Sequence, residues 1–276
     1  MITLKKYENG FEYIEVKNSN CSAKIALQGA HLFEYKRKGE RDLLWLSSES
    51  EFREGSAIRG GVPLCWPSFG TNNPELPQHG FARTSLFELV ESSDDEESTQ
   101  ITLRLRESEK SLSLWSYKFE LELKLTLSNT LTMELKTTNR DTKPFKLTQA
   151  LHSYFNISDI ADVKVEGLKD TLRFDALTQE RTRVVEDIEF NQEYDSVFQE
   201  VKECVVLVDR ERTISITNAG SSSVVVWNPW IEKCARMSAM SSEAYREFLC
   251  IESANAYEDF RVLEPLEVHT LKVRIL

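Results

Sequence analysis

Apolar and polar side chains alternate with a period of two through long parts of this chain. The alternation is clearest in YKFELELKLTLS (117–128) and LTMELKTT (131–138), and it recurs in EYIEV (12–16) and TQITLRLRE (99–107). A β-strand with one buried face has this period, because successive side chains point to opposite faces of the sheet. The first two segments predict a hairpin that turns at residues 128–130.

Further strands are predicted in VVLVDRERTISITNAGSSSVVVWN (205–228) and at the end of the chain in HTLKVRIL (269–276). A helical pattern is confined to SSEAYREFL (241–249), where we expect one short helix capped by Ser241 or Ser242. The acidic run ESSDDEES (91–98) predicts a solvated hairpin loop. Together these signals predict an all-β fold, a large antiparallel β-sandwich that forms one domain over residues 1–276.

Composition excludes several classes of function. The 276 residues are 41% hydrophobic and carry a net charge of −11, so the surface as a whole repels nucleic acid and anionic membranes. No segment reads as a secretory signal or as a membrane span. The five cysteines form no CxxC pair, which favours reduced thiols. We therefore expect a monomeric cytoplasmic protein with no nucleic-acid or membrane partner.

One long irregular segment, residues 58–83, interrupts the strand pattern. It holds four of the seven prolines and four of the ten glycines, together with several aromatic residues. Long ordered loops in compact domains often carry function. Within it, Arg59 and Arg83 could bind an anion bidentately. Four aromatic residues could form an apolar platform for a sugar ring: Trp66, Phe69, Phe81 and Trp230.

The titratable residues supply an acid–base inventory. Of the four histidines, His269 lies in the terminal strand and His31 at a turn or strand start, and both are interpreted as structural. His79 and His152 could exchange a proton near neutral pH, and Glu252 could act as a base. From spacing alone, Glu252 could equally be a solvent-facing residue of a half-buried strand. The chain has no metal-ligand spacing and no nucleotide-binding loop, so neither a metal nor a cofactor is predicted.

Five segments in order resemble the glucose-6-phosphate 1-epimerase family, which belongs to the wider aldose 1-epimerase group. They are IRGGVPLCWPSFG (58–70), PQHGFAR (77–83), LHSYFNISDI (151–160), WNPWIEKCARM (227–237) and CIESANA (250–256). The resemblance implies a galactose mutarotase-like sandwich that interconverts the anomers of hexose 6-phosphates, glucose 6-phosphate above all, without a cofactor. It implies Glu252 as general base and His152 as general acid.

The same resemblance implies substrate contacts from Arg59, Gln78, His79, Arg83 and Asp195. Three positions depart from the pattern of the family. Ser196 follows Asp195 where relatives usually carry arginine, and Ala239 and Ser242 stand where relatives commonly carry acids. These departures leave the choice of sugar open.

Two other functions remain to be weighed. The first is a mutarotase for neutral sugars such as galactose or glucose; the paired loop arginines favour a phosphorylated substrate instead. The second is a non-catalytic carbohydrate-binding protein on the same sandwich, since a fold does not fix a function. The presence of both His152 and Glu252 argues against a pure binder.

Overall fold

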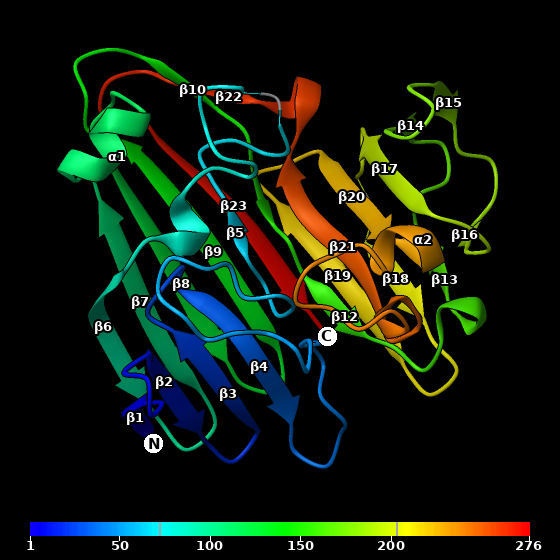
Figure 1. Ribbon diagram of the computed structural model, residues 1–276, viewed down its shortest axis with the longest axis horizontal. Coiled ribbons are helices and arrows are strands. Elements are labelled where there is room, and N and C mark those ends of the chain that lie inside the picture. The colour runs from blue at the N-terminus through cyan, green and yellow to red at the C-terminus, as the bar shows by residue number, and fades with distance from the viewer. Residues whose placement is uncertain (72, 203) are drawn as a thin grey trace.

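The computed structural model describes residues 1–71, 73–202 and 204–276. Every ladder between its named strands is antiparallel, so the predicted all-β antiparallel architecture is confirmed (Figure 1). The largest sheet has nine strands, in the order β16-β13-β18-β19-β23-β9-β8-β7-β6. Their bounds are Ile188–Glu189 (β16), Lys164–Glu166 (β13), Val205–Val208 (β18), Thr213–Ala219 (β19), Val268–Ile275 (β23), Leu131–Asn139 (β9), Phe119–Leu127 (β8), Thr99–Arg106 (β7) and Glu88–Asp94 (β6).

A second sheet has eight strands, in the order β15-β14-β17-β20-β21-β11-β5, with β12 also paired to β21. Two smaller sheets hold four strands (β1-β2-β3-β4) and two strands (β10-β22). The bounds in the eight-stranded sheet are Arg181–Arg183 (β15), Leu172–Asp175 (β14), Tyr194–Gln199 (β17), Ser223–Asn228 (β20), Phe248–Asn255 (β21), Gln149–Leu151 (β11), Leu64–Cys65 (β5) and Tyr154–Asn156 (β12). Those in the smaller sheets are Ile2–Lys6 (β1), Glu12–Lys17 (β2), Cys21–Ala26 (β3), His31–Arg37 (β4), Phe145–Leu147 (β10) and Arg261–Leu263 (β22).

In the nine-stranded sheet, the period-two pattern determines which side chains are buried. In β8, every second residue from Phe119 to Leu127 is buried, and the residues between them are partly or fully exposed. The pattern continues in β9, and the turn between β8 and β9 falls at residues 128–130 as predicted. The buried side chains face the core of the sandwich.

The layers are joined by one core and by hydrogen bonds between sheets. A single cluster of buried apolar residues draws on the four-, eight- and nine-stranded sheets. The Trp66 indole N–H donates to Thr137 Oγ1 over 3.0 Å, which ties the residue after β5 to β9. The Tyr35 hydroxyl of β4 donates to the carbonyl of Ser128 over 2.6 Å. The single-domain assignment stays a prediction.

Helix is scarce, and the helix predicted at residues 241–249 is wrong. Only a 3₁₀ turn, Ala244–Arg246, forms there, without a side-chain cap, because the chain enters the buried strand β21 at Phe248. The sequence patterns did not predict the two short helices that do form, Glu109–Leu114 (α1) and Trp230–Cys234 (α2). The remaining 3₁₀ turns are Ala82–Thr84, Ile160–Asp162 and Tyr257–Asp259.

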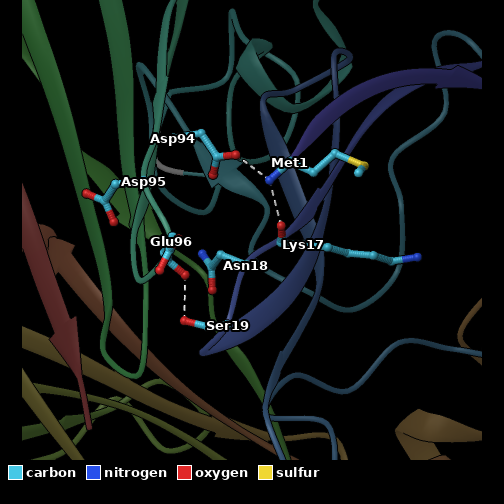
Figure 2. A pocket seen from close by; sticks show the side chains of 7 residues that line it. All are labelled: Met1, Lys17, Asn18, Ser19, Asp94, Asp95 and Glu96. Carbon is cyan, nitrogen blue, oxygen red and sulfur yellow. Dashed lines mark hydrogen bonds and ion pairs between the residues drawn. The ribbon is translucent and has the colours of Figure 1, made fainter.

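The acidic run 91–98 is only partly a loop. Residues 91–94 belong to β6, and the turn itself spans the last four residues of the run. Figure 2 shows the carboxylate of Asp94 and the carbonyl of Lys17 meeting the amino group of Met1, while Ser19 bonds the carbonyl of Glu96. Asp94 therefore helps to hold the start of the chain against β6, the edge strand of the nine-stranded sheet.

Two further sequence expectations concern cysteines and membranes. All five cysteines are free, and all but Cys204 are buried, so no thiol forms a disulfide. In the described part of the chain, no helix combines the length and the apolarity that crossing a lipid bilayer requires.

Candidate active site

A pocket of about 680 Å³ lies over the eight-stranded sheet, and all seven predicted site residues line it. They come from separate parts of the chain and include both members of the predicted acid–base pair. Their places in the pocket are observed, whereas their catalytic and binding roles stay predictions. The seven residues are Arg59, Gln78, His79, Arg83, His152, Asp195 and Glu252.

Glu252 lies on the floor of the pocket, on the central strand β21 and opposite Val225 of β20. Only 1% of the residue is exposed to solvent, so the alternative of a solvent-facing glutamate is wrong. Its Oε2 atom has no hydrogen-bond partner among the described residues. Burial, and then the nearby carboxylate of Asp195, raise the pKa of Glu252 well above its usual range.

His152 occupies the break between β11 and β12, where the pairing with β21 is interrupted. Its backbone N–H donates to the carbonyl of Pro63 over 3.1 Å, and its ring stacks on Tyr154 with 4.8 Å between ring centroids. These contacts place its Nε2 atom 3.3 Å from Oε1 of Glu252. Burial, followed by the neighbouring His79, lowers the pKa of His152 well below its usual range.

His79 reaches the pocket from the long loop. Its backbone has a left-handed φ of 64°, and the next residue, Gly80, has a φ of 71°. A Cβ at Gly80 would lie 2.1 Å from the carbonyl oxygen of Trp66, so only glycine fits beside the chain there. The Nδ1 atom of His79 accepts from the N–H of Gly70 over 3.3 Å. Burial and then Arg83 lower the pKa of His79 to about 3, which keeps the ring neutral at physiological pH.

The two loop arginines differ from most other cations of the protein. Arg83 donates to the carbonyl of Gln78 over 2.8 Å, and the backbone of Arg59 is held by Ser50 Oγ over 2.8 Å. Neither guanidinium takes part in an ion pair with a carboxylate of the described residues. Neither arginine therefore serves as the partner of a structural carboxylate among the described residues. Two uncompensated positive charges line the pocket.

Asp195 lies on the third strand of the site, β17, next to Trp227 of β20. Its Oδ2 atom is 3.9 Å from Nζ of Lys233, and the same ammonium pairs with Glu193 at 2.7 Å. Burial raises the pKa of Asp195 to about 6 in spite of Lys233. Ser196, which stands where relatives usually have arginine, is buried and accepts from Arg173 Nε over 2.9 Å.

The predicted aromatic platform is largely wrong. Trp66 and Phe81 belong to the core, where Trp66 packs against Phe119 with 4.5 Å between centroids, and Trp230 packs on Tyr245 outside the pocket. Only Phe69 lines the pocket as expected. Loop position alone did not reveal which way each ring would point. The aromatic residues that line the pocket are Phe69, Tyr154, Trp227 and Tyr257.

Sequence reasoning missed several other pocket residues. Lys233 lies in the family-like segment 227–237 but was not predicted as a site residue, and Gln179 lies in none of the five segments. Ala239 and Ser242 are not among the residues that line the pocket. Within the described ranges, no three His, Cys, Asp or Glu side chains converge as metal ligands do. That the reaction needs no cofactor stays a prediction.

A carboxylate and an imidazole 3.3 Å apart in a pocket of this size have the chemistry to exchange protons with a bound molecule. Together with the antiparallel sandwich, they define the class of mutarotase-like proteins. The model of the aldose 1-epimerase family matches residues 12–276. The chain belongs to the aldose 1-epimerase family.

Within this family, the chain is similar to proteins that share one name. A protein of Escherichia coli (strain K12) named "Putative glucose-6-phosphate 1-epimerase" is 35% identical over 263 residues, which are 94% of this chain and 88% of that protein. A protein of the same name from the plant Cenchrus ciliaris is 35% identical and covers 96% of this chain and 84% of its own length.

Solved structures agree on the fold. The crystal structure of YeaD from Salmonella typhimurium, described as "a putative mutarotase", superposes with a TM-score of 0.93 at 32% identity and covers 99% of this chain and 92% of its own. A galactose mutarotase related enzyme from Lactobacillus acidophilus reaches a TM-score of 0.76 at 16% identity, over 95% of this chain and 96% of its own. The second likeness shows the galactose mutarotase-like fold alone, which confirms the predicted fold class.

Proposed function

We propose that this protein interconverts the α and β anomers of hexose 6-phosphates, with glucose 6-phosphate as the principal substrate. The observation that carries the proposal is the contact between Glu252 and His152, 3.3 Å apart, in a pocket with two arginines that have no carboxylate partner among the described residues. The family and the names of its relatives support the reaction type and the phosphorylated substrate.

The proposed reaction needs two proton transfers. Glu252, ionised, takes the proton of the anomeric hydroxyl, while His152, protonated, gives a proton to the ring oxygen. The bond between C1 and the ring oxygen breaks, and an open-chain aldehyde forms. Rotation about C1–C2 and the reverse transfers on the other face of the carbonyl close the ring as the other anomer. Each such transfer contributes about 10² to 10⁴ in rate.

The proton count of the pair is the same before and after ring opening. The reactive state is Glu252 carboxylate with His152 imidazolium, and the open-chain state has Glu252 protonated with His152 neutral. Burial favours the second, uncharged form, because it raises the pKa of Glu252 and lowers that of His152. On closure Glu252 gives its proton back to the sugar and His152 takes one back. The cycle therefore needs no net uptake of protons from solvent.

Arg59 and Arg83 are the proposed phosphate anchors. Lys233, the third cation of the pocket, is already paired with Glu193 and lies near Asp195, whereas the two guanidinium groups have no carboxylate partner in the described chain. A phosphate dianion would neutralise them. The same neutralisation would favour a protonated His152, because both arginines lower the pKa of that ring. Phosphate would thus improve catalysis as well as binding.

The test compares glucose 6-phosphate with free glucose by NMR magnetisation transfer between anomers. We expect wild type to prefer the phosphorylated sugar in kcat/KM. Arg59→Ala or Arg83→Ala should lower that preference about ten- to a hundredfold, since a charged hydrogen bond contributes about 1.5–3 kcal/mol. The rate with free glucose should not fall, because free glucose has no phosphate to lose and the loss of one arginine favours a protonated His152.

A matched control is Arg106→Ala, which removes an exposed arginine paired with Glu120 on the nine-stranded sheet. It should leave the preference unchanged. If wild type shows no preference for phosphate, or if the Arg59 and Arg83 variants lose both substrates equally, the neutral-sugar mutarotase becomes the better assignment. No anomer exchange with either sugar would favour a carbohydrate-binding protein.

A further inference from the structure

A second cavity of about 410 Å³ adjoins the sugar pocket. It is lined by residues of the long loop, by one residue after α1, by β10 and the residue that follows it, and by one residue after β21. Among the described residues, Tyr257 is the one that lines both cavities. The lining residues with apolar side chains are Pro67, Leu76, Trp115 and Leu147.

Tyr257 is placed to be a wall between the two cavities. It follows the buried strand β21, five residues after Glu252, and begins a 3₁₀ turn. Its ring packs against Phe174 of β14 with 4.9 Å between centroids, so a strand next to the edge of the eight-stranded sheet supports the side chain. On the side of the long loop, Phe69 lines the sugar pocket while Pro67 lines the second cavity.

The backbone of Tyr257 is held in a left-handed conformation with a φ of 53°. This conformation is unfavourable for a bulky residue and persists only where the surroundings impose it. The buried carboxylate of Asp259 supplies the constraint. It accepts from the N–H of Ser222 over 3.0 Å and from Asn255 Nδ2 over 3.0 Å, which fixes the turn to β20 and β21.

Two more hydrogen bonds hold the chain immediately before Tyr257. The N–H of Ala256 donates to Ser223 Oγ over 3.0 Å, and that hydroxyl donates to the carbonyl of Ala254 over 2.7 Å. The chain that enters the turn is therefore fixed on both sides. A side chain that the fold holds this firmly between two cavities is a candidate for a function.

We propose that Tyr257 is a specificity-determining residue that limits the sugar to a single unsubstituted hexose ring. The cavity behind it has the size to take an acyl or aryl substituent on the ring, and the tyrosine keeps such substituents out. The apolar residues of the cavity would contact the substituent, and its polar residues are Ser68, Asn73, Lys146 and Thr148. This inference rests on the proposed function, since it concerns which hexose 6-phosphates reach Glu252 and His152.

The experiment measures anomer exchange by wild type and by Tyr257→Gly, Tyr257→Phe and Leu266→Gly. Glycine removes the wall and accepts the left-handed backbone, while phenylalanine keeps the wall and removes only the hydroxyl. Leu266 is exposed and has a φ of 66°, so its change to glycine controls for the relief of backbone strain away from the site. The probes are glucose 6-phosphate and three analogues with a free anomeric hydroxyl: N-acetylglucosamine 6-phosphate, 3-O-benzylglucose 6-phosphate and 4-O-benzylglucose 6-phosphate.

We expect kcat/KM for at least one analogue, relative to glucose 6-phosphate, to rise at least about tenfold in Tyr257→Gly, equivalent to about 1.4 kcal/mol. The ratio should stay at the wild-type value in Tyr257→Phe and Leu266→Gly. A crystal structure of Tyr257→Gly should show one continuous cavity. Unchanged ratios for all three analogues, or the same rise in Tyr257→Phe, would overturn the assignment of Tyr257. No exchange of glucose 6-phosphate by wild type would instead overturn the proposed function.

Discussion

The nine-stranded and eight-stranded sheets bury their residues in different ways. In β8, buried residues alternate with residues that are partly or fully exposed, and the outer face carries charged pairs such as Lys136 with Glu122 at 2.8 Å. In β20 and β21, every residue is buried, and polar residues such as Asn228, Glu252 and Asn255 occur among the apolar ones. One sheet has a wet face, and the other is covered on both faces at its centre.

This difference in burial indicates which polar residues are candidates for a function. A polar residue on the wet face of the nine-stranded sheet costs little, because water solvates it. A carboxylate at 1% exposure in β21 is costly unless it is partnered or has a function. Asn228 and Asn255 have their hydrogen bonds within the protein, whereas one oxygen of Glu252 has none among the described residues. This buried carboxyl group is therefore the stronger candidate for a function.

The largest effect should come from the acid–base pair in the eight-stranded sheet. Glu252→Gln and His152→Ala should each lower the anomer exchange rate at least about a hundredfold with the fold intact, because each removes one proton transfer. Exchange is measured by NMR and folding by circular dichroism. The same change on the wet face, Glu122→Gln, should leave the rate unchanged. Near wild-type exchange in either site variant would remove that residue from the mechanism.

A core residue of the nine-stranded sheet should show the opposite behaviour. Leu123 is fully buried on the inner face of β8. Leu123→Ala should lower the free energy of unfolding by about 2–5 kcal/mol, because a cavity replaces the lost methyl groups. At a temperature where the variant is folded, kcat for glucose 6-phosphate should not change. Urea unfolding and exchange kinetics on the same sample test both statements. A tenfold loss of kcat would contradict the claim that this core residue affects stability alone.

The buried carboxylate should also make stability depend on pH. Since the folded pKa of Glu252 is raised, its contribution to stability is fully present below about pH 4.3, the unfolded value, and is lost as the pH rises through the folded pKa. Glu252→Gln removes this loss. Relative to wild type, the variant should therefore become more stable as the pH increases from 4 to 8. Urea unfolding at pH 4, 6 and 8 measures the difference, and a difference independent of pH would contradict the raised pKa.

The smallest effect should come from the charged pair on the wet face. Glu122→Gln leaves Lys136 without its partner, but both groups contact water, and the free energy of unfolding should fall by less than about 1 kcal/mol. The loss should shrink further in 1 M salt, because the pair is screened there. A cost of several kcal/mol, unchanged by salt, would show that the outer face of this sheet is not equivalent to solvent.

The sequence by itself determined the all-β class and much of the nine-stranded sheet. Strands β7, β8, β9 and β23 and the turn at residues 128–130 follow from period-two patterning, since burial of one face fixes the side of each residue locally. The helix predicted at residues 241–249 does not form. The segment has a helical pattern, but its last two residues belong to the buried strand β21.

Residue type and context made five of the seven site residues candidates, the family resemblance added Gln78 and Asp195 and assigned the roles, and the tertiary structure decided that all seven lie together. Glu252, His152 and Arg59 are far apart in the chain and meet because β21 pairs with β11, β12 and β20 while the long loop passes over them. The structure also placed Trp66 in the core and Trp227 and Tyr257 at the pocket. Apolar and polar residues alternate along a strand where one face contacts water and the other contacts the core. This alternation vanishes where both faces are covered, so the direction of each side chain there depends on contacts between distant segments.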